Sequence, residues 1–309
     1  MPSTATDTGL TADRPTAAGA DQRTGPGAES VGAGAGPIAG PGTAPSFRPT
    51  RITAECRGGR ARFTELDQGH YLAPRPVRGA FPAAPNHVRV ALIGIHMMLL
   101  GGDDVRLQVR VGPGTVLEVV EPAGMVAYDA DGVASRWTLD AQLGEGAALI
   151  WEGAPFIAAD GANVHRSTRI SLAAGARALV REALVLGRSG EQGGDLRSIT
   201  RLTGPDGDLL YEDLDLTGPR RRAVGVLGGT KVLAGATAAG WRPGPLPVGP
   251  TSELSGTEVP GGGTARRFDL AADGAVLRAL TDSAHRADRQ LDAGWKAWKD
   301  ELLGRSGPA

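Results

Sequence analysis

Cysteine is almost absent from this chain of 309 residues, in which Cys56 is the only one. A single cysteine cannot form an internal disulfide, so we expect a reduced thiol in a cytoplasmic protein. The sequence also lacks an apolar run of the roughly 18 residues that a membrane span requires. Its N-terminus has neither the basic start nor the apolar core of a signal peptide. We therefore expect a protein that is neither inserted into a membrane nor exported.

An excess of either charge is missing as well. The 33 basic and 34 acidic residues give a formal net charge of -1. Nucleic acids and anionic membranes are bound through strong positive fields, which this composition does not supply. Partners must then be recognised by local surface features.

The motifs of the common enzyme classes are also absent. There is no nucleophile elbow, no zinc-protease helix, no phosphate loop and no cysteine pair. The histidines stand singly, at positions 70, 87, 96, 165 and 285. Because tight metal sites use clustered imidazole or thiolate ligands, no tight site is predicted. These absences favour a protein that holds other proteins over one that catalyses a reaction.

Glycine and proline, in contrast, are abundant, with 47 and 22 residues. This favours strands joined by tight turns over a mostly helical fold. Residues 1–48 are Ala, Gly, Thr and Pro with almost no large apolar side chain, so we predict a disordered tail. Residues 49–305 carry the apolar patterning, and we assign them to one mainly β domain.

Two hairpins are predicted from alternating segments that flank turn residues. The first joins 51–56 to 61–66 across Arg57–Arg60, and the second joins 197–202 to 209–216 across Pro205-Asp206-Gly207. Strict alternation over 105–111 predicts a further strand.

A strand–turn–strand unit then recurs three times. Its copies cover 107–120, 137–151 and 168–186, with turn glycines at 114, 146 and 175. Spacings of 32 and 29 residues favour a β-helix-like solenoid body, built from stacked hairpins or irregular coils. Recurrence by chance of similar hairpins in a β protein is the alternative.

The C-terminal part has a different period. Apolar residues are spaced by three or four at Leu277, Leu280, Ala284, Ala287, Leu291, Trp295, Trp298 and Leu302. This predicts an amphipathic helix over about 281–303, capped by residue 281, 282 or 283 and ended by Gly304. The stripe of Leu291, Trp295 and Trp298 packs against the body or docks a partner, since tryptophans anchor interfaces.

Two other segments before this helix have weaker signals. Small apolar residues over 223–239 predict a strand followed by a short helix, and the Pro- and Gly-rich segment 243–263 predicts a loop.

Acidic residues beside glycines stand out at two places. Asp103-Asp104 follows Gly101-Gly102, and Glu191 follows the segment Gly187-Arg188-Ser189-Gly190. Such residues favour tight turns, or they line a polar path, or the carboxylate pairs with Arg188. The spacing leaves these alternatives open.

Four segments together resemble the urease accessory protein family UreD, also called UreH. They are 99–107 (LLGGDDVRL) with 111–114 (VGPG), 121–128 (EPAGMVAY), 149–157 (LIWEGAPFI) and 183–191 (ALVLGRSGE). The likeness spans about 50–305. It differs from many relatives at Ile150, where they have an acidic residue before Trp151, and at Val126-Ala127-Tyr128, where they have Lys-Val-Tyr.

The resemblance implies a non-catalytic urease maturation factor with a β-helix-like body and C-terminal helices. Such a protein binds apo-urease and UreF, and through UreF the GTPase UreG, so that nickel in transit reaches the urease active site along a polar tunnel. No tightly bound cofactor is implied. Asp103 and Glu191 are carried over as candidate residues of the nickel path or of the turn structure, with Gly101, Gly102, Gly187 and Arg188 as their turn residues.

An alternative function is a small-molecule or carbohydrate-acting solenoid enzyme. Such enzymes present aromatic platforms and paired carboxylates, whereas aromatic residues are only 4% of this chain. The composition therefore favours the maturation factor.

Overall fold

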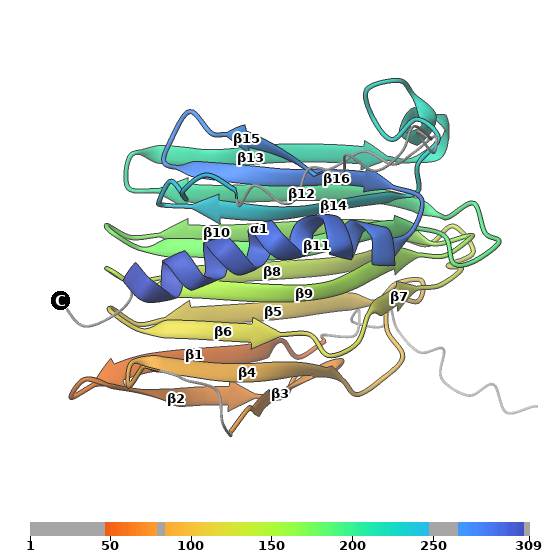
Figure 1. Cartoon of the computed structure of the whole chain (residues 1–309). Helices are drawn as coiled ribbons and strands as arrows, with labels where there is room; N and C mark the ends of the chain where they lie inside the picture. Colours follow the sequence, from red (N-terminus) through yellow and green to blue (C-terminus); the bar gives the residue numbers. More distant parts are fainter. Residues whose placement is uncertain (1–46, 79–83, 247–264, 306–309) are drawn as a thin grey trace, which may run out of the picture. The chain divides into compact units, whose positions relative to one another are not determined.

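The computed structural model describes residues 47–78, 84–246 and 265–305, all within one compact unit over 45–309. Nearly all of the predicted tail and most of the predicted loop at 243–263 lie outside these residues. Strands dominate the described chain, and they form two sheets and a solenoid of about four turns (Figure 1). The mainly β solenoid predicted from the turn spacing is thus confirmed.

The first sheet has seven strands in the order β13-β12-β10-β8-β5-β1-β2. Its five central strands run parallel and each outer strand is antiparallel to its neighbour. The strands are β1 (Thr50–Arg57), β2 (Arg60–Asp67), β5 (Asp104–Val111), β8 (Ser135–Leu143), β10 (Asn163–Leu172), β12 (Asp195–Gly204) and β13 (Gly207–Leu216).

The second sheet follows the order β15-β16-β14-β11-β9-β6-β4-β3, and β7 also pairs with β9. Strands β4, β6, β9 and β11 run parallel to one another. Strands β3, β14, β16 and β15 each run antiparallel to their neighbours on this path. The strands are β3 (Leu72–Pro76), β4 (His87–Gly94), β6 (Val116–Val120), β7 (Met125–Ala127), β9 (Ala148–Ala158), β11 (Arg177–Leu186), β14 (Val232–Ala239), β15 (Arg266–Asp269) and β16 (Gly274–Thr281).

The predicted repeat is a solenoid coil and not a hairpin. In each copy the strand before the turn belongs to the first sheet and the strand after it to the second, as β8 and β9 do. The turns stack, because the amide of Gly114 donates to Glu145 O at 2.9 Å and that of Gly146 to Ala174 O at 3.0 Å. The glycines at 114, 146 and 175 all have a left-handed φ of 61–67°, which is why glycine recurs there.

Hairpins lie where the winding begins and where it ends. The antiparallel pairs β1–β2 and β12–β13 match the two predicted hairpins. The helix predicted within 223–239 was wrong: turns fill the first part of this range and the strand β14 the rest, and a short 3-10 helix, η1 (Gly218–Arg222), lies before it. Small residues suit a central strand that is packed on both faces as well as they suit a helix, so composition did not distinguish them.

Helix α1 (Ala284–Arg305) lies against the face of the second sheet that points away from the first, over β16, β14 and β11 (Figure 1). It begins three residues later than predicted, because Thr281 is the last residue of β16. The carbonyl of Ser283 accepts the first helical bond, and Gly304 lies within the last turn and does not end the helix. One apolar cluster fills the space between the sheets, and a second joins the second sheet to α1.

Candidate functional site: a charged row inside the solenoid

A row of five charged residues runs through the apolar space between the two sheets. We call it the charged row, and it consists of Glu121, Arg166, Glu182, Arg278 and Glu212. Arg166 and Glu212 project from the first sheet, Glu182 and Arg278 from the second, and Glu121 follows β6. The side chains of the last four are only 9–24% exposed. Charged groups are expensive to bury, so a row of them in a core is a functional candidate.

The central contacts of the row are ion pairs across the core. Arg166 Nη1 donates to Glu182 Oε2 at 2.7 Å and to Ser198 Oγ at 3.3 Å. Arg278 Nη1 lies 3.9 Å from Glu182 Oε1, while its Nη2 donates to Glu212 Oε2 at 2.5 Å. Burial works to raise the pKa of Glu182, but the charges of Arg166 and Arg278 outweigh it and lower the pKa below its ordinary value. Glu182 is therefore an ionised carboxylate held between two cations.

Glycines make room for this arrangement. Gly235 of β14 pairs with both Glu182 and Arg278, and a Cβ there would lie 2.9 Å from Arg278 Nη1. At Gly153 of β9 the register with β11 shifts, and a Cβ would lie 2.6 Å from Arg181 O. The irregularity leaves the next amide, that of Ala154, to donate to Glu121 Oε2 at 3.1 Å.

Glu121 connects the row to the surface. Its Oε1 accepts a 2.9 Å hydrogen bond from Trp151 Nε1. Burial raises the pKa of Glu121 despite the bonds from Trp151 and Ala154 and the nearby charge of Arg166. The residue lines two cavities at once, an open pocket of about 290 Å³ and a smaller cavity of about 20 Å³ beside Arg166 and Glu182. Glu121 therefore lies in the wall of both the surface pocket and the cavity beside the charged row.

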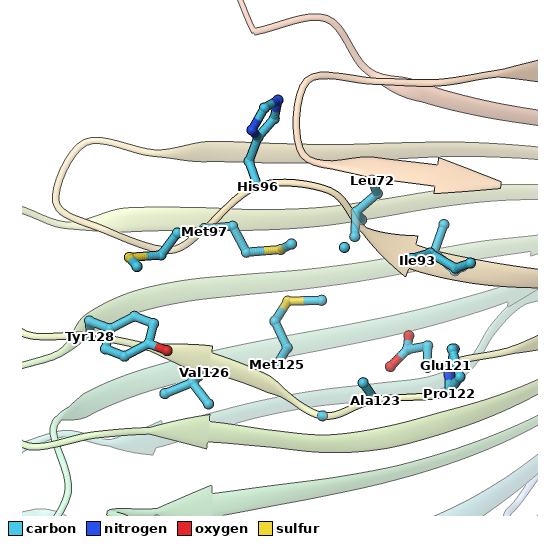
Figure 2. Close-up of a pocket in the computed structure, with 14 residues that line it drawn as sticks. Leu72, Ile93, His96, Met97, Glu121, Pro122, Ala123, Met125, Val126 and Tyr128 are labelled. Atoms are coloured by element: carbon cyan, nitrogen blue, oxygen red, sulfur yellow. The ribbon is translucent and has the colours of Figure 1, made fainter.

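The open pocket, which we call the mouth pocket, has a mixed lining. Three methionines, Met97, Met98 and Met125, line it together with Glu121 and Tyr128. Figure 2 shows Glu121 and Met125 rising into the space, whereas the imidazole of His96 points away to the other side of its own loop. His96 and Glu121 therefore do not converge on a common ligand.

The smaller cavity has unsatisfied polar groups in its wall. Within the part of the chain that the structure describes, Trp137 Nε1, Arg166 Nε and Thr168 Oγ1 are buried and make no hydrogen bond. A cavity of this size holds about one water molecule, which these groups would bind.

Asp103, a candidate from the sequence, holds a turn at the same end of the solenoid. Its Oδ1 accepts a 2.7 Å hydrogen bond from Tyr71 Oη, and its Oδ2 accepts one of 2.9 Å from Leu100 N. Burial and the bond to Asp103 raise the pKa of Tyr71 well above its ordinary value. Gly102 has a φ of 86°, and a Cβ at Gly101 would lie 2.9 Å from Ala130 O, so both glycines are required by the turn. Neither Asp103 nor its neighbour Asp104, which pairs with Arg106, belongs to the charged row.

Glu191, the other candidate, closes a turn of its own. It accepts hydrogen bonds from Arg188 N at 2.8 Å, Arg188 Nε at 2.7 Å and Asp160 N at 3.2 Å. The bonds from Arg188 lower the pKa of Glu191 to about 2. Gly187 has a φ of 81°, and a Cβ there would lie 2.9 Å from Glu191 O. The structure gives Glu191, Arg188 and Gly187 a part in this turn, and it does not bring Glu191 together with Asp103.

Comparisons with known proteins decide the family. The family model described as "UreD urease accessory protein" matches residues 50–309. Urease accessory protein UreD 1 of Streptomyces griseus is 42% identical over 255 residues, which cover 82% of this chain and 92% of that protein. Urease accessory protein UreD of a Parafrankia species is 34% identical, with the same shares covered. The chain belongs to the UreD family.

The stripe on α1, for which packing against the body and docking of a partner were the two alternatives, is buried in this structure. Leu291, Trp295 and Trp298 are 1%, 5% and 0% exposed and pack on the second sheet. Packing against the body is therefore enough to explain why these three residues are apolar. Docking through the stripe stays a prediction, and it would require α1 to leave the sheet.

Ion pairs hold α1 of this UreD chain in place. Lys299 Nζ lies 2.5 Å from Glu118 Oε1 and 3.2 Å from Glu152 Oε2, and Arg181 pairs with Asp288 and Asp292. Burial opposes ionisation of Glu118, but hydrogen bonds from His87 and Lys299 and the charge of Arg89 lower its pKa to about 2.

Sequence reasoning missed the charged row. Its members lie far apart in the sequence and match no spacing rule. The available signals were a charged residue at an inward-facing strand position, as at Glu182, and a glycine within an apolar strand, as at Gly235. Two further absences hold for the described residues: no helix is long and apolar enough to cross a membrane, and no three His, Cys, Asp or Glu side chains gather as metal ligands.

Proposed function

We propose that this UreD-family chain is a non-catalytic scaffold of urease maturation in the cytoplasm, and that nickel passes through it along the charged row. In this proposal the scaffold binds apo-urease and UreF, and through UreF the GTPase UreG. The names of the relatives, urease accessory proteins, support the process. The charged row is the observation that supports the route.

The composition of the row suits an ion in transit. Glu121, Glu182 and Glu212 offer carboxylate oxygens, which bind Ni²⁺ more weakly than imidazole or thiolate does. Each carboxylate already has a hydrogen-bond donor beside it, so an arriving ion competes with Trp151, Arg166 or Arg278. Weak, replaceable contacts let an ion move on instead of being trapped.

The position of the row also fits a route. It begins at the mouth pocket beside β7 and ends at Glu212 of β13, the edge strand of the first sheet. In proteins generally, apolar residues of similar volume often stabilise a core as well as a buried ion pair does. Charges kept at such a cost therefore favour a role beyond folding.

The experiment is urease activation in cells that carry the complete urease operon under limiting nickel. The gene for this chain is deleted and then restored, with urease subunit levels checked by blot. Urease, UreF and UreG that co-purify with the tagged chain are identified, and the nickel content of the urease is measured. Loss of activity and of nickel at normal subunit levels, rescued by the gene, supports the proposal; unchanged activity and nickel content contradict it.

A further inference from the structure

A third cavity lies away from the charged row, between the segment after β11 and the turns that precede β14. It has a volume of about 330 Å³. Three cationic side chains line it, those of Arg221, Arg222 and Lys231, together with Gly228 and Gly229. We call it the cationic pocket. Nothing in the proposed nickel route uses it.

The three cations bond only to neutral oxygens, all from residues 191–194. Arg221 Nη1 donates to Gly194 O at 2.7 Å and Arg222 Nη2 to Gln192 Oε1 at 2.6 Å. Lys231 Nζ donates to the main-chain carbonyl of Glu191. Within the described residues none of the three forms an ion pair, whereas Arg220 beside them pairs with Asp215 at 2.7 Å. Their side chains are oriented while their charges stay uncompensated.

The carboxylates in, next to or bonded to residues 191–194 are engaged with other groups. That of Glu191 holds Arg188, and Asp160 Oδ1 accepts the amides of Gln192 and Gly193 at 2.9 and 2.6 Å. Asp195 Oδ1 accepts the amide of Gly218 at 2.7 Å. The positive charge of the pocket is therefore available to a ligand.

Main-chain donors add to the side chains. The amides of Gly228 and Gly229 make no hydrogen bond to the described part of the chain, although their neighbour Thr230 N bonds to Leu227 O. A Cβ at either glycine would meet no atom within 4 Å, so both residues border open space. Free glycine amides beside cationic side chains are a common setting for phosphate oxygens.

We propose that the cationic pocket binds the phosphate group of a small molecule. The pocket offers three positive charges and two free amides. A carboxylate has a single negative charge and two oxygens, so it would leave part of this charge and some of these donors without a partner. A phosphate group carries up to two charges at neutral pH and accepts hydrogen bonds on three or four oxygens. The volume exceeds that of phosphate itself and leaves room for the organic part of a phosphate ester.

The probe is inorganic phosphate, titrated into the full-length chain by calorimetry at constant ionic strength, with chloride and malonate as comparison anions. Arg222→Gln and Lys231→Gln each remove one charge while the other donors remain. Arg110→Gln is the matched control, because Arg110 is exposed on β5 and makes no ion pair within the described residues. Amide chemical shifts of Gly228 and Gly229 report the position of the ligand.

We expect phosphate to bind with at least tenfold preference over malonate and to shift both glycine amides. We expect each pocket variant to weaken phosphate binding at least tenfold and Arg110→Gln to leave it unchanged. Binding of malonate as tight as that of phosphate would overturn the phosphate assignment. The absence of saturable binding, or equal binding by the pocket variants and the original chain, would overturn the site.

Discussion

Arg166 donates a 2.7 Å hydrogen bond to Glu182 across the interior of the solenoid, and so joins strand β10 of one sheet to strand β11 of the other. The guanidinium group also lies over the ring of Trp137, 4.6 Å from its centroid. A cation–π contact of this kind helps to compensate a buried charge. The pair therefore lies at the centre of the charged row.

Breaking this pair on one side should be more damaging than replacing both partners. We expect Glu182→Gln to lower the free energy of unfolding by about 3 kcal/mol, because Arg166 is left buried without its counter-charge. The double variant Arg166→Met/Glu182→Leu should lose less, since it buries no unpaired charge. Urea unfolding measures both. Arg197→Gln, which opens an exposed pair with Asp213, is the control and should cost under about 1 kcal/mol.

Gly235 should tolerate no side chain. In Gly235→Ala the new methyl group would meet Arg278 Nη1 and Leu277 O at 2.9 Å, and the latter is main chain that cannot turn aside. We expect a loss of about 1–3 kcal/mol in the free energy of unfolding. Gly304→Ala is the control, because a Cβ there meets nothing and alanine favours the last turn of α1. Equal stability of the two variants would refute the close packing described for Arg278.

The anchor of α1 should depend on pH. The pKa of Glu118 is about 2 in the folded chain and about 4.5 ordinarily, so folding favours its ionised form. Its contribution to stability is complete above about pH 4.5 and is lost as the pH falls toward 2. We expect Lys299→Met to cost about 2 kcal/mol at pH 7 and less at pH 3, where part of the Glu118 contribution is already lost, whereas Lys296→Met, exposed on the same helix, should show no such difference. Unfolding curves at the two pH values measure this, and a cost for Lys299→Met that does not change with pH would argue against the anchor.

Asp103 should act through the turn that it holds. Asp103→Ala leaves Leu100 N and Tyr71 Oη without their acceptor, and we expect a loss of about 1–3 kcal/mol. Asp103→Asn keeps an oxygen for Leu100 N, and the Tyr71 hydroxyl can turn to accept from the new amide, so a smaller loss is expected. Thermal unfolding of both variants tests this. Similar losses in the two would mean that the charge of Asp103, and not its hydrogen bonds, stabilises the turn.

Much of the fold could be predicted from local patterns. Turn glycines 114, 146 and 175 predicted the solenoid because a left-handed turn recurs once per coil. The same pattern could not distinguish a coil from a hairpin, since both are a strand, a turn and a strand. The apolar stripe that includes Trp295 and Trp298 predicted α1, but a buried face and a docking face have the same helical period, so the spacing could not distinguish them.

The site was less accessible to sequence reasoning. Asp103 and Glu191 are visible because their partners are neighbours in the sequence, at Leu100 and Arg188. Glu212 and Arg278 are 66 residues apart and meet only because the strands β13 and β16 lie near each other after the winding. No local spacing in the sequence predicts such a contact.

The most direct test of the proposed route closes it without leaving a buried charge. Arg166→Met/Glu182→Leu replaces the centre of the charged row by apolar groups, and Arg197→Gln/Asp213→Asn removes an exposed pair as the control. Nickel bound per urease is measured under limiting nickel, in cells where each variant is shown to be folded and to co-purify with its partners. The account predicts at least a tenfold loss of urease nickel for the first variant and none for the second. Equal nickel loading by both would contradict transit through the charged row.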